Sequence, residues 1–446
     1  MFDHVVVKKG GDAVALTVSV CCLSVLGMIA LALSEHRLHP KHPSVRIFWA
    51  APLVGALLLV VCRVLSPVEV IQGLNADSAI NPIKILVLFF AMTLMSVFLD
   101  EEGFFRYLAS AVLAKAGSDQ RKLFFLLYAA VSVLTVFTSN DIVVLTFTPF
   151  ICYFAKHAKI DPLPYLICEF VAANTWSMAL IIGNPTNIYL AASAGVGFAE
   201  YLKIMILPTV MGGIASLVAL WLLFGRRLRT PMEPSEAHEC IADKPTVILG
   251  IVALGGCILL MVLSSYINIA MWLIAAVCCA VLYVGAAAEL GLRHRKLTPV
   301  RRSLLRAPFD VAPFVLSMFV LVMGLNTVGV TAQLSEWLLG TGEVFRVGVG
   351  SFLAANLVNN IPMSVLFSSV VAPAGVTSVS ALYAAVVGSN IGAFFTPLGA
   401  LAGIMWMALL RQHGVKLSFG RFALYGAAIS IPTLLATLGG LWLVLL

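Results

Sequence analysis

Long apolar runs recur along the whole chain, and they constrain its fold more than any other feature. A run of about 18 or more apolar residues with few charges is long enough to cross a bilayer as a helix. Charged residues make up only 11% of the 446 residues, and the mean hydropathy is +1.02. The sequence therefore predicts an all-α polytopic membrane protein, and no part of it resembles a soluble domain.

The loop charges alternate along the chain and predict the orientation of the spans. The loop at 34–48 is basic, the loop at 66–80 has acids but no Lys or Arg, and the loop at 289–308 is the most basic of all. Because cytoplasmic loops carry an excess of Lys and Arg, we expect the basic loops in the cytoplasm. Lys8 and Lys9 then lie outside, which departs from the pattern.

This orientation makes the second half of the chain an inverted copy of the first half. In each half, three spans are followed by an amphipathic piece, a polar-interrupted hairpin, a broken helix and one closing span. Inverted repeats with interrupted spans are typical of secondary transporters. The first repeat, 1–225, is predicted to have scaffold spans near 13–34, 47–65 and 82–99, a hairpin at about 138–155 and a broken helix at about 162–195. A cytoplasmic linker follows at 226–245. The second repeat, 246–446, is predicted to have scaffold spans near 246–265, 270–288 and 311–328, a hairpin at about 356–373 and a broken helix at about 379–411.

Polar residues interrupt four apolar segments. "IIGNPTNIYL" at 181–190 and "FTPLGAL" at 395–401 break helices, and "TSND" at 138–141 and "NN" at 359–360 mark hairpin tips. Irregular backbone at membrane depth is tolerated only when it is buried in protein or lines a cavity. We therefore expect a small polar site near the midplane between the halves. Its predicted lining is Thr138, Ser139, Asn140, Asp141, Asn184, Thr186, Asn187, Asn359, Asn360, Ser389, Asn390 and Thr396.

The predicted lining consists of hydroxyls, amides and one acid, without Lys or Arg. It suits a neutral polyhydroxyl solute, an ion held by oxygens, or an anion held by dipoles. Asp141 is the sharpest candidate because acids inside membranes are costly and usually functional; its alternative is a hairpin cap at one surface. Glu169 is a second candidate acid that could equally lie near the interface. The amides alone could also serve as contacts between helices.

Other function classes lack their sequence patterns. There is no Ser/His/Asp pattern, phosphate loop or metal-ligand spacing, so the sequence predicts neither an enzyme nor a metal site nor a cofactor. His36, His39 and His42 are expected to be solvated in a loop. The net charge of +7 lies in loops and does not indicate a nucleic-acid partner. The cysteines in apolar segments are read as small hydrophobic residues: Cys21, Cys62, Cys152, Cys168, Cys257 and Cys278.

Roughly residues 80–440 resemble the arsenite permease branch of the ion transporter superfamily. The stretches that carry the resemblance are "LDEEGFFRYLASAVLAKAGSDQRKLFFLLY", "TSNDIVVLTFTPF", "RAPFDVAPFVLSMFVLVMGLNTVGVTAQLSEWL", "NNIPMSVLF" and "GSNIGAFFTPLGALAGIMWMALLRQHGV". The "GNPTNI" motif is shared more widely, with sodium/proton antiporters and divalent anion/sodium symporters. In the symporters, a similar hairpin tip binds sodium and carboxylate, and Asn140 matches that tip.

The resemblance implies a transport domain that bears the hairpins, a scaffold domain, and often a homodimer, in the bacterial inner membrane. It implies export of arsenite or antimonite as the neutral trihydroxide, coupled to proton entry, with a soluble ATPase as a partner of such exporters. Acids often stand in that family where this chain has Asn174 and Asn390, which leaves Asp141 as the main candidate for the coupling site. Sodium at Asn140, Asp141 and Asn187 is the alternative, either in a sodium-coupled carboxylate carrier or in a sodium/proton antiporter.

Overall fold

The computed structural model describes residues 11–38, 47–76, 81–233, 241, 243–372 and 378–446. Within these ranges the regular elements are helices, and eight of them are long and apolar enough to cross a membrane. The predicted all-α polytopic membrane fold is therefore confirmed. Several residues discussed above lie outside the described part, namely Lys8, Lys9, His39, His42 and most of 234–242, and the side chain of His36 is not described either.

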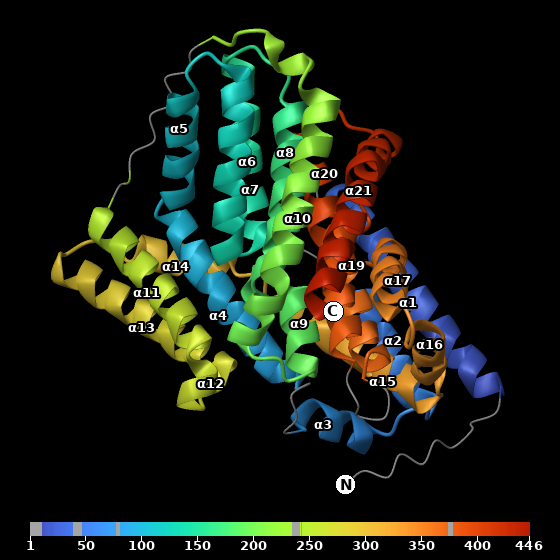
Figure 1. Ribbon diagram of the computed structural model, residues 1–446. Helices are drawn as coiled ribbons and strands as arrows, with labels where there is room; N and C mark the ends of the chain where they lie inside the picture. Colours follow the sequence, from blue (N-terminus) through green and yellow to red (C-terminus); the bar gives the residue numbers. More distant parts are fainter. Residues whose placement is uncertain (1–10, 39–46, 77–80, 234–240, 242, 373–377) are drawn as a thin grey trace.

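Apart from the short helix α12, the helices of the second half follow the same order as those of the first (Figure 1). The first half comprises α1 (Gly11–Leu38), α2 (Ala50–Val61), α3 (Pro67–Asn75), α4 (Pro82–Glu101), α5 (Phe104–Ala116), α6 (Gln120–Phe137), α7 (Asn140–His157), α8 (Leu163–Trp176), the short turns η1 (Ser177–Ala179) and η2 (Ile181–Gly183), α9 (Pro185–Ser193), α10 (Phe198–Phe224) and η3 (Arg227–Arg229). The second comprises α11 (Lys244–Val262), α12 (Ser264–Ile267), α13 (Met271–Leu292), α14 (Thr298–Arg306), α15 (Val311–Thr327), α16 (Val330–Leu338), α17 (Glu343–Val358), α18 (Asn360–Val370), α19 (Val379–Gly392), α20 (Leu401–Gln412) and α21 (Phe419–Leu445).

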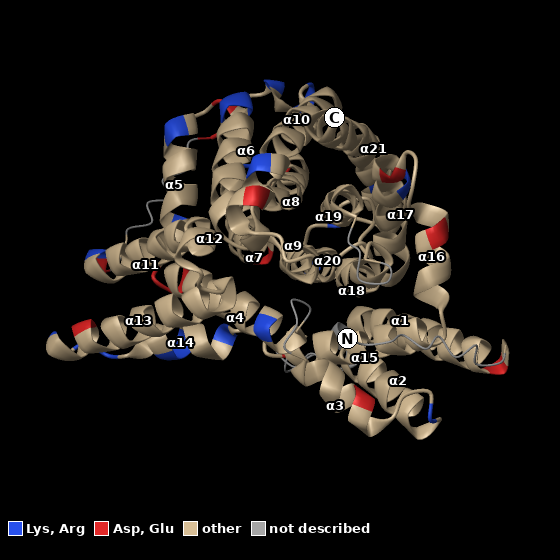
Figure 2. Cartoon of the chain, turned by 60° about the horizontal axis from the view of Figure 1, so that its bottom comes forward, with Lys and Arg blue, Asp and Glu red and all other residues tan. Residues whose placement is uncertain are grey.

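The outer helices form two three-helix lobes. Helices α1 and α2 pack with α15, whereas α11 and α13 pack with α4. Figures 1 and 2 show one lobe to the left and the other to the right, with the central bundle above and between them. Each lobe thus combines the first two long helices of one half with the third of the other half, so that the same unit is built twice with the halves exchanged.

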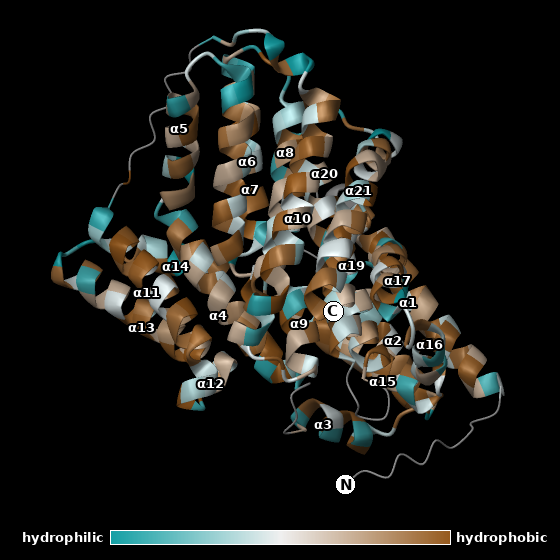
Figure 3. Cartoon of the chain, in the orientation of Figure 1, coloured by the Kyte–Doolittle hydropathy of each residue, from teal (hydrophilic) through white to brown (hydrophobic). Residues whose placement is uncertain are grey.

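The central bundle contains the predicted hairpins and broken helices. Helix α6 contacts α8, α17 contacts α19, and α10 packs along α21. Almost every residue of α8 and α19 is buried. Figure 3 shows apolar residues along the helices and hydrophilic residues gathered in the loops at the top of the view. The broken helices therefore lie at the centre of the fold, where irregular backbone is shielded from lipid.

The hairpins and the second span differ in extent from the predicted ranges. The hairpin turns lie at Thr138–Ser139 and at Asn359, and each has a full helical arm before its turn. The predicted hairpin ranges began at or near the polar tips and so did not include most of these first arms, α6 and α17. The span expected near 47–65 is the shorter helix α2, because Ser66 caps α3 and Pro67 occupies its first turn.

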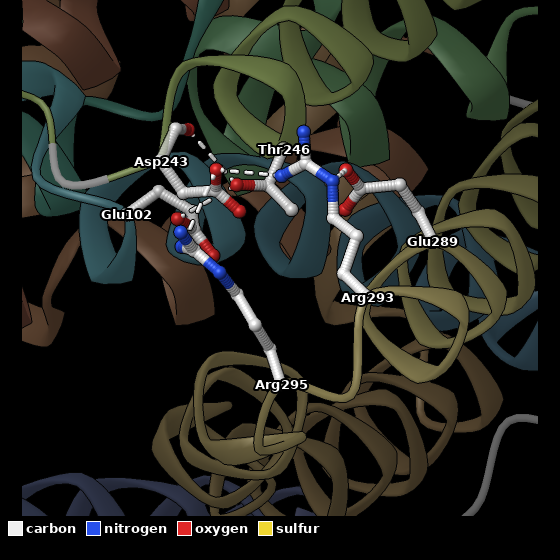
Figure 4. A network of polar contacts seen from close by, with 6 residues as sticks. All are labelled: Glu102, Asp243, Thr246, Glu289, Arg293 and Arg295. Carbon is white, nitrogen blue, oxygen red and sulfur yellow. Dashed lines mark hydrogen bonds and ion pairs between the residues drawn. The ribbon is translucent and has the colours of Figure 1, made fainter.

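A polar network fixes the end of the lobe that contains α4 (Figure 4). Arg293 donates from Nη1 to Asp243 Oδ1 at 3.0 Å and lies 3.0 Å through Nε from Glu289 Oε1. Thr246 Oγ1 donates to Glu102 Oε2 at 3.0 Å. Burial raises the pKa of the Glu102 carboxyl, although the Thr246 hydrogen bond acts in the opposite direction. These contacts join the C-terminal end of α4 to α11 and α13.

Candidate functional site

The first helix break lies between α8 and α9 and is closed by side-chain amides. Asn184 caps α9 by accepting a hydrogen bond from the Thr186 backbone at 3.1 Å. Asn187 Nδ2 donates to the carbonyls of Ser177, at 2.8 Å, and Leu180, at 3.2 Å. A Cβ at Gly183 would lie 2.2 Å from the Ser177 carbonyl oxygen, so only glycine fits there. The break is therefore a defined structure that the motif specifies.

Asn390, from α19 in the other half, completes the first break. Its Oδ1 accepts hydrogen bonds from Ser177 Oγ at 2.8 Å and Asn184 Nδ2 at 3.1 Å. Its Nδ2 donates to Asn187 Oδ1 at 2.7 Å and to the Val386 carbonyl at 2.8 Å. All four bonds are buried, and three of them join segments about 200 residues apart in the chain. One amide thus ties the two halves together at the break.

The first hairpin reaches the same region through Asn140. Its Nδ2 donates to Asn174 Oδ1 at 3.0 Å, and the Asn174 backbone carbonyl accepts from Ser177 Oγ at 2.9 Å. Asn140 Oδ1 is buried and has no hydrogen-bond partner in the described part of the chain, and the same holds for Ser389 Oγ beside Asn390. Buried polar atoms normally have partners, so these two atoms have unused hydrogen-bonding capacity. We call this connected set the amide network: Asn140, Asn174, Ser177, Asn184, Thr186, Asn187 and Asn390.

The second break, between α19 and α20, is closed from within its own half. Asn356 Oδ1 accepts from the Thr396 backbone at 3.1 Å and from Thr396 Oγ1 at 2.7 Å. Its Nδ2 donates to the Gly392 carbonyl at 3.0 Å. A Cβ at Gly399 would lie 2.2 Å from that same carbonyl oxygen, which repeats the requirement seen at the first break. The two breaks share the close approach of a glycine to a carbonyl oxygen, but different residues close them.

The second hairpin tip also contacts the second break. Asn359 Nδ2 donates to the Leu398 carbonyl at 3.1 Å, and the Asn360 backbone donates to the Gly399 carbonyl at 3.1 Å. Asn359 has φ +78° and ψ 154°, a region that is almost restricted to glycine. The corresponding turn residue of the first hairpin, Ser139, has an ordinary φ of −83°. The second tip is therefore held in a strained backbone by its contacts.

Two carboxylates lie close to these elements. Asp141 is in the first turn of α7, next to Asn140, and is half-buried. Glu169, in α8, is completely buried, and both of its carboxylate oxygens lie 3.0 Å from Thr148 Oγ1 of α7. Glu169 is therefore a buried acid, as one of the two sequence-based alternatives had it. One residue further along, Phe170 stacks on Trp406 of α20, with ring centroids 4.8 Å apart.

The predicted lining residues divide between the two clusters. Asn140, Asn184, Thr186, Asn187 and Asn390 lie in the amide network, whereas Asn359, Asn360 and Thr396 lie at the second break.

The remaining predicted residues flank the amide network. Thr138 bonds its own helix at the Leu134 carbonyl, and Ser139 begins α7 without a side-chain cap. Sequence reasoning missed the roles of Ser177 and Asn356. Their signal was spacing, since Ser177 follows Asn174 by three residues and Asn356 precedes Asn359 by three, which is one helical turn.

Comparison with known proteins gives consistent relatives. A family model described as "Citrate transporter" (CitMHS) matches residues 29–376. The arsenical pump membrane protein of Escherichia coli (strain K12) is 30% identical over 422 residues, covering 89% of this chain and 93% of that protein. The putative arsenical pump membrane protein of Bacillus subtilis (strain 168) is 24% identical, covering 86% and 91%. The YdaH transporter of Alcanivorax borkumensis, known from a crystal structure with an unusual topology, has a similar fold, with a TM-score of 0.59 at 15% identity over 97% and 98% of the two chains.

Proposed function

Since the chain belongs to the citrate transporter (CitMHS) family, we propose that it exports arsenite or antimonite as the neutral trihydroxide in exchange for protons. It is a multi-pass transporter of the bacterial inner membrane, and the arsenite permease resemblance inferred from its sequence is confirmed by the relatives named arsenical pump membrane protein. The substrate and the coupling ion are the new parts of this proposal.

The amide network carries the choice of substrate. A neutral trihydroxide offers hydroxyl donors and oxygen acceptors, and the network offers both kinds of partner without a Lys or Arg. Asn140 Oδ1 and Ser389 Oγ are buried with unused hydrogen-bonding capacity. A site built to hydrogen-bond a hydroxyl discriminates strongly against a solute that lacks it. The network thus favours a small neutral polyhydroxyl solute over a multiply charged anion.

The exchanged arrangement of the lobes supports alternating access between two inverted halves. Each lobe borrows its third helix from the opposite half, and the two hairpins and two broken helices occupy matching places in the helix order. In transporters with inverted repeats, substrate binds between the repeats and access alternates as one part moves against the other. We place the solute at the first break because Asn390 there joins the two halves.

For the coupling ion we propose protons carried by a carboxylate. Asp141 adjoins Asn140 at the hairpin tip, and Glu169 is buried against Thr148. An acid at membrane depth is expensive in its charged form, so binding of a cation or proton changes the cost of moving it. Neither carboxylate is needed for hydrogen bonding of the solute by the amides, which separates coupling from recognition.

A sodium-coupled carboxylate carrier is the second candidate function, and the family description favours it. Such a carrier would need to stabilise a carboxylate substrate with helix termini alone, because the network supplies no cationic side chain. Sodium held at Asn140, Asp141 and Asn187 would serve this carrier or a sodium/proton antiporter. Sodium-dependent thermal stabilisation of the purified protein, without added arsenite, would support these alternatives.

The test is arsenite tolerance in a sensitive host together with vesicle transport. We expect the wild type to confer tolerance, and Asp141→Asn to insert normally but lose gradient-driven accumulation while keeping passive equilibration of solute. Glu169→Gln, measured in the same assays, tests the second carboxylate as the coupling site. If uptake in the Asp141→Asn vesicles still followed the imposed pH gradient, the coupling site would be elsewhere, with Glu169 next. Failure of the wild type to confer tolerance would contradict the arsenite assignment.

A further inference from the structure

The loop between α13 and α15 contains a short helix, α14, with an unusual charge pattern. Its sequence, "TPVRRSLLR", has three arginines and no acid in nine residues. The matching helix of the first half, α3, reads "PVEVIQGLN" and has an acid and no Lys or Arg. Both helices connect the second and third outer helices of their halves. The same architectural element is therefore strongly basic in one half and not in the other.

One face of α14 is docked on the protein. Ser303 is buried and accepts from Tyr283 Oη at 2.9 Å. Arg306 places Nη2 2.8 Å from Asp100 Oδ2 and also pairs with Glu101, so it clamps the end of α4. Asp100 in turn accepts from Thr146 Oγ1 of the hairpin helix α7 at 2.7 Å. The docked face thus connects α14 to the first hairpin through two polar contacts.

The other face of α14 presents cations and leucines together. Arg301, Arg302 and the preceding Lys296 are exposed, and Leu304 and Leu305 are 42% and 71% exposed. Arg301 and Leu305 are four residues apart and therefore neighbours on one helix face. Among the residues that the structure describes, the nearby acids pair with Arg293, Arg295 and Arg306, and no ion pair engages these three cations. Figure 2 shows the basic residues clustered at α14.

We propose that α14 binds the headgroups of anionic phospholipids in the cytoplasmic leaflet through Lys296, Arg301 and Arg302, with Leu304 and Leu305 inserted toward the acyl chains. A helix that combines a basic face with exposed apolar residues lies in the membrane interface, and anionic headgroups attract it. The orientation predicted by the loop charges places this helix on the cytoplasmic side. Through Arg306 and Asp100, lipid bound to α14 holds the end of α4 against the hairpin and sets the transport rate.

The first experiment measures lipid retention and needs no knowledge of the transported solute. The protein is incubated with phosphatidylglycerol, delipidated stepwise in detergent, and examined by native mass spectrometry. We expect Arg301→Gln/Arg302→Gln to weaken phosphatidylglycerol binding about 30-fold. Each basic residue near an anionic surface strengthens binding about fivefold, and the variant removes two of them. The matched control is Arg226→Gln/Arg229→Gln, which removes two exposed arginines from another loop and should retain the lipid.

The second experiment separates binding from its effect on transport. Flux is compared between vesicles of phosphatidylcholine alone and vesicles with equal parts of phosphatidylglycerol. We expect severalfold faster flux with phosphatidylglycerol for the wild type and the control, and no difference for Arg301→Gln/Arg302→Gln. Arg306→Gln should retain the lipid but lose the rate difference. Unchanged lipid retention in the Arg301→Gln/Arg302→Gln variant would overturn the proposal and leave α14 as a surface for an acidic protein. Equal wild-type flux in both kinds of vesicle would overturn the claim that bound lipid sets the transport rate.

Discussion

The two helix breaks use the same backbone device but are closed by different partners. Each has a glycine, Gly183 or Gly399, whose absent Cβ makes room for a carbonyl oxygen. The first break is completed by Asn390 from the opposite half, whereas Asn356 closes the second from its own half. The contacts at the first break therefore depend on the packing of one half against the other, whereas those at the second break form within one half.

This difference assigns different roles to the two breaks. The first break holds the amide network and the unused hydrogen-bonding atom of Asn140, so we place recognition of the solute there. The second break is saturated by Asn356 and by the strained tip at Asn359, so we interpret it as a support for the half-helices α19 and α20. The following predictions test that division.

The largest expected effect separates Asn390 from Asn356. Asn390→Ala removes four buried hydrogen bonds and the link between halves, and we expect transport per folded molecule to fall more than about tenfold. Asn356→Ala removes partly buried hydrogen bonds and should lower the unfolding temperature, but the folded fraction should transport at nearly the normal rate. Vesicle flux normalised to folded protein, with thermal unfolding in parallel, checks this. Equal losses of flux in the two variants would remove the distinction between the breaks.

A second comparison tests the shared device. Gly183→Ala and Gly399→Ala each place a methyl group 2.2 Å from a carbonyl oxygen, so we expect each to destabilise the protein by about 1–3 kcal/mol or more. Gly439→Ala is a matched control, because a Cβ there meets nothing within 4 Å. Thermal unfolding in detergent would show the drop. A normal unfolding temperature for either break variant would contradict the close approach of the carbonyl oxygen to that glycine.

The smallest effect concerns the hairpin tips. The Asn359→Gly variant should be more stable than Asn359→Ala by about 1–3 kcal/mol. Both variants lose the same side-chain hydrogen bonds, but only alanine is strained at this positive φ. At Ser139, whose φ is ordinary, the order should reverse, with Gly less stable than Ala by roughly 0.5–1 kcal/mol. Unfolding temperatures of the four variants decide the matter. The same order at both positions would argue against strain at the second tip.

Much of the fold could be predicted because membrane burial leaves strong signals in the sequence. Apolar runs mark the long helices, and the "GNPTN" and "TPLG" interruptions mark the breaks, since polar residues at that depth need a reason. Asn184 and Asn187 lie in the first of these interruptions, and Asn390 was part of the predicted lining; all three make several hydrogen bonds in the amide network. The arms α6 and α17 were harder to define because the polar residues within them do not form a break that marks the start of a hairpin.

The partners within the site could not be predicted from local patterns. Ser177 bonds Asn390, which is 213 residues away, and Asn356 bonds Thr396, which is 40 residues away. Such pairs depend on the packing of whole helices. The burial of Glu169 was undecidable for the same reason, because it depends on where α8 lies relative to α7 and α20.

A structure with antimonite bound would test the central claim most directly, because antimony scatters strongly enough to be located without ambiguity. The account predicts the metalloid at the first break, with its oxygens within hydrogen-bonding distance of the amide network and of Asn140 Oδ1. It also predicts no metalloid at the buried thiols of Cys152 and Cys168. Density for antimony at the second break beside Asn356, or on either thiol, would contradict it.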